Sequence, residues 1–128
     1  FKSYNNQSTA LTNQWIDWSS LVFGLHCATY TAHTMLLPLE KRNRILASET
    51  QKKIYASFEI LDKQLQKHQF LLDNDFSLAD IPVGCWLHRC VVLDLGFSGY
   101  KSLEDLYLRL KKRSAFQKAV ISAPLPPN

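Results

Sequence analysis

Asp17 is the first residue whose type and position suggest chemistry, because it lies between Trp15 and Trp18 near the expected start of a helix. Helical spacing places three further residues on its face: Asn13, Ser20 and Gly24. In a partly dry cleft, such a carboxylate can accept a charge-assisted hydrogen bond from an ammonium group. The alternative is a solvated Asp17 on the polar side of an amphipathic helix, and the sequence favours neither.

Aromatic side chains on the same segment and on a later one could shape an apolar ligand pocket. They are Trp15, Trp18, Phe23 and Trp86. Aromatic residues at helical spacing are more often part of a core, so we expect most of these to be core residues.

Cys85, His88 and Cys90 lie close together in the sequence and could suggest a metal site. On a helix, positions 85 and 88 share a face while position 90 points elsewhere, and no second cluster completes a tetrahedral ligand set, so we predict no metal. A cysteine nucleophile activated by His88 would need a cleft and an orienting group, and neither is visible. We therefore predict buried structural thiols and no catalytic residue in this chain.

Arg89 lies within an otherwise apolar segment. A buried guanidinium requires a carboxylate partner, and Asp94 and Asp17 are the candidates for a pair within the core. The alternative is that Arg89 faces a pocket and contacts an anion there.

Composition and charge suit one globular domain. The chain has 128 residues, of which 46% are hydrophobic and 20% charged, and its net charge is +4. A nucleic-acid-binding domain usually carries a denser basic face, and the basic run Lys111–Arg113 is better explained as a solvated helix end. We therefore predict no nucleic-acid partner.

The sequence also gives expectations about the cellular compartment. The apolar run Ile81–Leu95 is interrupted by His88, Arg89 and Asp94, so we predict that it does not span a membrane, and no signal peptide is visible. The three cysteines are an odd number without the spacing of a disulfide framework. This pattern favours a reducing compartment, and we expect a cytoplasmic protein.

Four long helices and two short helical segments are expected to position these residues. Thr9 can cap the first, which is expected to end at Pro38 and to pack through Leu11, Trp15, Trp18, Val22 and Leu25. A short helix or turn is expected at Glu40–Leu46. Ser48, with Gln51 as capping-box partner, is the predicted start of the next helix, which ends near His68 and has the inner face Ile54, Phe58, Leu61 and Leu65.

The strongest local signal is the capping box of Ser77 and Asp80. Ser77 can accept a hydrogen bond from the N–H of Asp80, while the Asp80 carboxylate reaches back to the N–H of Ser77; Phe76 and Ile81 form a hydrophobic staple. The helix that follows, Leu78–Leu95, is apolar on nearly every side, which predicts a central helix that is buried all round. A further amphipathic helix, Ser102–Arg113, and a last short helix capped by Ser114 complete an all-α fold.

These segments resemble a known family. The chain contains Phe76-Ser77-Leu78-Ala79-Asp80-Ile81-Pro82, preceded by Ile60-Leu61-Asp62-Lys63-Gln64-Leu65, followed by Leu106-Tyr107-Leu108-Arg109-Leu110, and opened by Asn13-Gln14-Trp15-Ile16-Asp17-Trp18. In this order they resemble the C-terminal helical domain of glutathione S-transferases, particularly bacterial, beta- and theta-like members. Leu110-Lys111-Lys112-Arg113-Ser114-Ala115-Phe116 is similar to the closing arginine-rich helix end, with Ser114 where Pro is usual. The implied fold is a helical bundle around a buried central helix.

The resemblance implies a domain organisation. In this family an N-terminal thioredoxin-like domain binds most of the glutathione and carries the Ser, Tyr or Cys that activates the thiol. Nothing in this sequence has its βαβ pattern, so the chain resembles the second half of a transferase, without that partner domain. Residues 1–8 would be an interdomain linker or frayed N-terminus, residues 9–123 the helical domain, and residues 124–128 a Pro-rich tail.

The resemblance also implies a site. The position of Asp17 supplies a polar contact to the γ-glutamyl ammonium of glutathione, often across a dimer interface, and a homodimer is therefore expected. The electrophile pocket would be lined by Asn13, Ser20, Gly24 and Arg89. Beta-class enzymes carry a His where this chain has Gly24, so help from that side chain is absent. Glutathione would be a co-substrate of the intact protein, with no covalently bound cofactor.

Two functions follow. In the first, the chain supplies the electrophile pocket and dimer surface for glutathione conjugation, is inactive alone, and exposes an apolar patch where the thioredoxin-like domain docks. In the second, it is a non-catalytic assembly module, as in translation elongation and aminoacyl-tRNA synthetase complexes.

Overall fold

The computed structural model describes residues 6–122, and this part of the chain contains helices and loops but no strand. The predicted all-α fold is therefore confirmed. Residues 1–5 of the predicted linker and the predicted tail, residues 124–128, lie outside the described residues.

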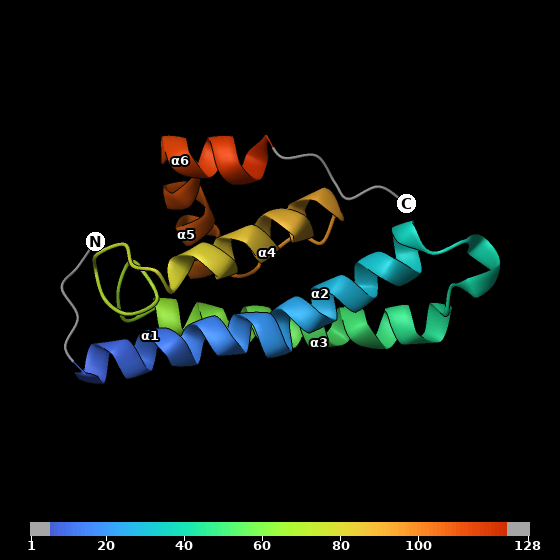
Figure 1. The fold of residues 1–128 in the computed structure, drawn as a ribbon, viewed down its shortest axis with the longest axis horizontal. Coiled ribbons are helices and arrows are strands. Elements are labelled where there is room, and N and C mark those ends of the chain that lie inside the picture. The colour runs from blue at the N-terminus through green and yellow to red at the C-terminus, as the bar shows by residue number, and fades with distance from the viewer. Residues whose placement is uncertain (1–5, 123–128) are drawn as a thin grey trace.

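One long rod forms the first part of the fold (Figure 1). It consists of α1 (Asn6–Trp18), a π-helical turn (Ser19–Phe23), α2 (Gly24–Thr31) and a second π-helical turn (Ala32–Leu36). The helix begins before Thr9, so the prediction of Thr9 as its cap is wrong. Its end is as predicted, because Leu37 adopts an extended backbone in front of Pro38.

The buried face of this rod differs from the predicted apolar stripe. After Trp15, which is partly buried, every fourth residue is buried: Ser19, Phe23, Cys27 and Thr31. Leu11, Val22 and Leu25 are exposed instead. A π turn holds more residues than an α turn, so positions four apart stay aligned where an α-helix would rotate them away. The buried hydroxyls are satisfied because Ser19 Oγ donates to the Trp15 carbonyl and Thr31 Oγ1 to the Cys27 carbonyl, each at 2.7 Å.

Helix α3 (Arg44–Leu65) returns alongside the rod after a 3₁₀ turn at Leu39–Lys41 (Figure 1). Its cap is Asn43, whose side-chain oxygen accepts a hydrogen bond from the Leu46 N–H at 2.9 Å. The prediction of Ser48 as the cap is wrong, because the helix has already begun. The predicted inner face is confirmed, since its members are buried: Ile54, Phe58, Leu61 and Leu65.

Helix α4 (Asp80–Val92) lies alongside the rod, and α5 (Lys101–Lys111) and α6 (Ser114–Phe116) with the π turn Gln117–Ile121 follow it. The prediction that this helix is buried all round is wrong. One side contains buried Val83, Leu87 and Cys90, but Ile81 and Val92 are exposed on the other, and Val91 is exposed near the end of the helix. Within residues 6–122, α4 packs against α2, α5 and the Ser19–Phe23 and Gln117–Ile121 turns, whereas Ile81 and Val92 remain exposed to solvent.

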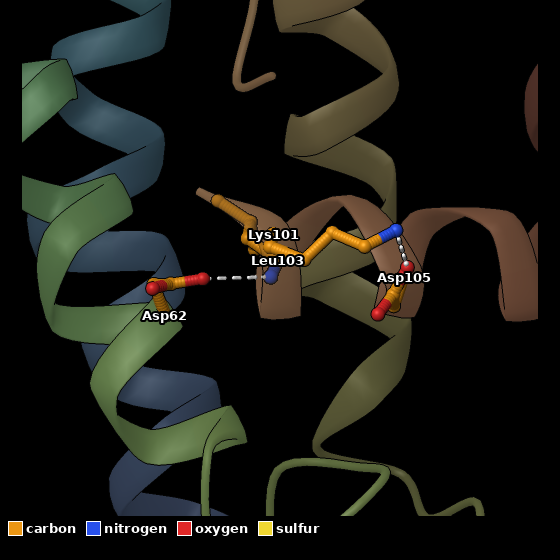
Figure 2. Close-up of polar contacts among 4 residues, drawn as sticks. All are labelled: Asp62, Lys101, Leu103 and Asp105. Atoms are coloured by element: carbon orange, nitrogen blue, oxygen red, sulfur yellow. Dashed lines mark hydrogen bonds and ion pairs between the residues drawn. The ribbon is translucent and has the colours of Figure 1, made fainter. Parts of the chain in front are cut away.

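A contact between α3 and α5 connects the two halves of the fold. Asp62 on α3 accepts a hydrogen bond from the Leu103 N–H in the first turn of α5 at 2.9 Å (Figure 2). The residue in front of α5, Tyr100, makes no side-chain cap of its own. Asp62 therefore satisfies one of the free N–H groups at the start of α5 from another helix.

Candidate functional site

The capping box before α4 exists with one change of partner. The Ser77 N–H donates to Asp80 Oδ2 at 2.8 Å, as predicted. Ser77 Oγ accepts from the Ala79 N–H at 3.3 Å and not from the Asp80 N–H, which donates to the Ser77 carbonyl at 3.1 Å. The helix consequently begins at Asp80, later than predicted.

Asp80 also holds the loop between α3 and α4. Its Oδ1 accepts a hydrogen bond from the Leu71 N–H at 3.0 Å, and its side chain is completely buried. Burial raises the pKa of the Asp80 carboxyl, whereas the hydrogen bonds from Leu71 and Ser77 and the charge of Arg113 oppose this rise. Asp80 therefore has a structural role: its carboxylate connects the loop at Leu71 to the start of α4.

The four predicted site residues of the first helix do not share one face in the structure. Asn13, Asp17 and Ser20 are exposed, but Gly24 is buried. A Cβ on Gly24 would lie 2.6 Å from the Ser19 carbonyl oxygen and 2.6 Å from Trp86 Nε1. Gly24 is therefore the point where α4 packs against the rod, because the π turn rotates it away from the Asp17 side.

Apolar side chains occupy the outer surface that continues from Asp17. Leu21 is 70% and Leu25 57% exposed, and both follow Asp17 at intervals of four residues. No side chain within residues 6–122 pairs with Asp17. The rod thus presents a free carboxylate next to an apolar strip, an arrangement that suits an amphipathic ligand or a covering partner.

Arg89 is half-buried and forms no ion pair with any described residue. Asp94, one of its two predicted partners, is exposed and has a left-handed backbone with φ of 60°. Asp17, the other, is exposed on α1. Neither predicted pair forms, and the prediction of Arg89 as a pocket residue stays a prediction.

The aromatic residues have different surroundings. Phe23 is a core residue and stacks on Trp18 at 5.8 Å between ring centroids. Trp15 and Trp18 are partly buried and line a shallow cavity of about 250 Å³ together with Gln14 and Ile60.

A second hollow, of about 270 Å³, lies between the start of α4 and the C-terminal helical segment. Phe76 and Ile81, the predicted staple, both line it, and the Arg113 guanidinium lies 3.8 Å from the Phe76 ring centroid. Apart from Arg113 its walls are apolar: Phe76, Ile81, Leu110, Ala115, Phe116, Ala119 and Val120.

Cys85, His88 and Cys90 do not form a common site. Cys90 is buried as predicted, but Cys85 is exposed. His88 Nδ1 is 2.9 Å from the Tyr107 hydroxyl oxygen, and burial, followed by the charges of Arg89 and Lys111, lowers the pKa of His88. Among residues 6–122, no three His, Cys, Asp or Glu side chains come together as a metal site.

The helices of the described part are all too short or too polar to cross a lipid bilayer.

Comparison with known proteins agrees with this geometry. The Glutathione S-transferase GstB of Escherichia coli (strain K12) is 22% identical over 112 residues, which cover 88% of this chain and 54% of the relative. The theta class glutathione S-transferase from Xanthomonas axonopodis pv. citri, solved with glutathione bound, has a TM-score of 0.85 at 21% identity and is covered over 64% of its length by 94% of this chain. The glutathione transferase URE2P5 from Phanerochaete chrysosporium has a TM-score of 0.83 at 23% identity, with coverage of 92% of this chain and 55% of that protein.

The chain spans about half the length of the curated relatives it matches. Residues 26–113 match the family described as Glutathione S-transferase, C-terminal domain. The match includes α3, α4, α5 and the capping box. The chain therefore belongs to the glutathione S-transferase family, through that family's C-terminal domain.

Proposed function

We propose that this chain is the helical half of a glutathione transferase and that its exposed rod face completes the substrate site. The observation that carries the proposal is the free, exposed Asp17 directly beside the exposed Leu21 and Leu25. A carboxylate can bind the γ-glutamyl ammonium of glutathione, and the leucines offer an apolar wall to an electrophile. Asn13 and Ser20, exposed on the same rod, would add hydrogen bonds at its polar end.

In the proposed reaction, the glutathione thiolate attacks an electrophilic centre, a carbon–sulfur bond forms, and the leaving group departs with the bonding electrons. A thioredoxin-like domain would activate the thiol. This chain would contribute orientation of the substrates and exclusion of water. Since no described residue is placed to activate a thiol, the chain alone is expected to be inactive.

The uncovered apolar side of α4 supports a partner domain. Ile81 and Val92 are exposed there, and Ile81 lines the hollow beside Phe76. Exposed apolar surface of this kind commonly marks an interaction site. We propose that the thioredoxin-like domain covers this surface, and that the intact enzyme is a homodimer that uses glutathione as its co-substrate.

The experiment is steady-state kinetics of the complete gene product with Asp17→Asn. Loss of one charge-assisted hydrogen bond should raise the KM for glutathione about tenfold or more, with a smaller change in the KM for the electrophile. Asp94→Asn is the matched control, because Asp94 is also exposed and unpaired and Asn tolerates its left-handed backbone. An unchanged KM for glutathione in Asp17→Asn would remove Asp17 from the site.

The same gene product distinguishes the alternative. A complete protein without a thioredoxin-like domain, or with one that binds no glutathione, would favour the assembly module.

A further inference from the structure

Two cysteines from different helices face each other in the core. Cys27 on α2 and Cys90 on α4 have their Sγ atoms 3.7 Å apart, although 63 positions separate them in the sequence. Both side chains are completely buried. The sulfur atoms are thus in van der Waals contact, and the fold has already paired the two thiols.

The close approach of the two helices has a structural cause one turn earlier. Gly24 on α2 packs against Trp86 on α4, and even a Cβ at Gly24 would lie only 2.6 Å from Trp86 Nε1. Because Gly24 precedes Cys27 as Trp86 precedes Cys90, the helices run side by side in the same direction (Figure 1). The absence of a side chain at Gly24 therefore sets the separation at which the thiols meet.

We propose that Cys27 and Cys90 are a reversible disulfide site, oxidised by hydrogen peroxide or a small organic hydroperoxide. One thiol loses its proton, and the thiolate attacks a peroxide oxygen. The O–O bond breaks, a sulfenic acid forms, and the leaving oxygen takes up that proton to give water, or an alcohol from an organic hydroperoxide. The other sulfur then attacks the sulfenic sulfur, the S–S bond forms, the S–O bond breaks, and hydroxide takes the remaining thiol proton and leaves as water. The thiols lose two electrons in total and the peroxide gains two.

Geometry makes the pair different from Cys85, which is exposed and has no thiol neighbour within residues 6–122. A sulfenic acid at Cys85 would be exposed to solvent, whereas a sulfenic acid at Cys27 or Cys90 would already be in contact with the second thiol. A neighbour held in contact has a very high effective concentration, so disulfide formation should outrun further oxidation to sulfinic acid.

The surroundings also predict a slow reaction. The hydrogen bond with Cys27, followed by burial, raises the pKa of the Cys90 thiol well above its usual value, so Cys90 rests as the protonated thiol. A large or charged oxidant cannot enter a closed apolar core. The oxidant must therefore be small, and local opening of α4 from α2 should set the rate.

The consequence is a covalent bond between α4 and α2, the second helix of the rod. A disulfide would fix α4 to the rod and would close a long loop of the chain, which restricts the unfolded state. This inference does not depend on glutathione chemistry, since it uses only contacts within residues 6–122.

The test uses the chain with Cys85→Ser, which leaves only the proposed pair. After incubation with hydrogen peroxide, the protein is unfolded, alkylated and weighed by mass spectrometry, and its peptides are mapped. We expect a product that takes up no alkylating reagent, has lost both thiol hydrogens and contains a Cys27–Cys90 peptide. Its thermal midpoint should rise by several degrees and return to the starting value with dithiothreitol.

The control is Cys27→Ala in the same background, which should give sulfinic acid or a free thiol at Cys90 and no rise in midpoint. Free thiols or sulfinic acids in the Cys85→Ser protein under the same conditions would overturn the proposal. So would a disulfide that forms only after the protein has been unfolded.

Discussion

Asp80 shows at the scale of single residues what local spacing can and cannot predict. Its bond to the Ser77 N–H follows from a separation of three residues and was predictable from the sequence alone. Its bond to the Leu71 N–H depends on the path of the loop between α3 and α4, which no local pattern describes. The same limit explains Cys27 and Cys90, whose contact depends on how two helices that are distant in the sequence pack together.

Asp80→Ala should lower the free energy of unfolding by about 2–4 kcal/mol, because it leaves two buried N–H groups without an acceptor. Urea unfolding measures this change. Asp75→Ala, at an exposed position in the same loop, is the control and should stay within about 0.5 kcal/mol of the parent. Equal losses in the two variants would show that the Asp80 bonds add little.

His88 should make stability depend on pH. Its pKa is lowered in the folded protein, so folding favours the neutral imidazole; the resulting stabilisation is complete above its ordinary pKa of about 6.5 and is lost as the pH falls through the lower folded value. The difference in unfolding free energy between the parent and His88→Gln should therefore shrink from about pH 8 to about pH 5. A difference that grows toward low pH would show that the charged form is preferred.

The π turns are the main feature that the sequence did not reveal at the scale of elements. The existence and approximate limits of the long helices were predictable, because apolar residues recur at helical intervals and Pro38 ends the first. The face of the rod was not, because the expected stripe through Leu11, Val22 and Leu25 assumes an unbroken α-helical period. A π turn is decided by packing, here by buried Ser19 and by Gly24 against Trp86.

Gly24→Ala tests this account of the rod. The added methyl group meets the Ser19 carbonyl and the Trp86 ring, and overpacking of this kind should cost about 1–3 kcal/mol of unfolding free energy. Gly99→Ala is the matched control, since a Cβ there meets nothing within 4 Å, and it should be nearly neutral. Equal stability of the two variants would mean that α4 does not depend on close approach at Gly24.

At the scale of the whole molecule, α4 is a core helix as predicted, but it is not buried on all sides. Its apolar residues surround the helix, which indicated burial on all sides. Within residues 6–122 only one side is covered, and Ile81 and Val92 on the opposite side remain 40% and 41% exposed. A sequence pattern reports which surfaces avoid water, but it cannot tell whether the same chain or a partner covers them. We propose that the thioredoxin-like domain of the intact enzyme covers the rest.

The most direct test of this proposal is a conjugation assay with glutathione and a reactive aryl halide on two proteins: the complete gene product and this chain alone. We predict glutathione-dependent turnover by the complete protein and none above the uncatalysed rate by the chain. Turnover by the chain comparable to that of the complete protein, or none by a folded complete protein across a panel of electrophiles, would contradict the proposal.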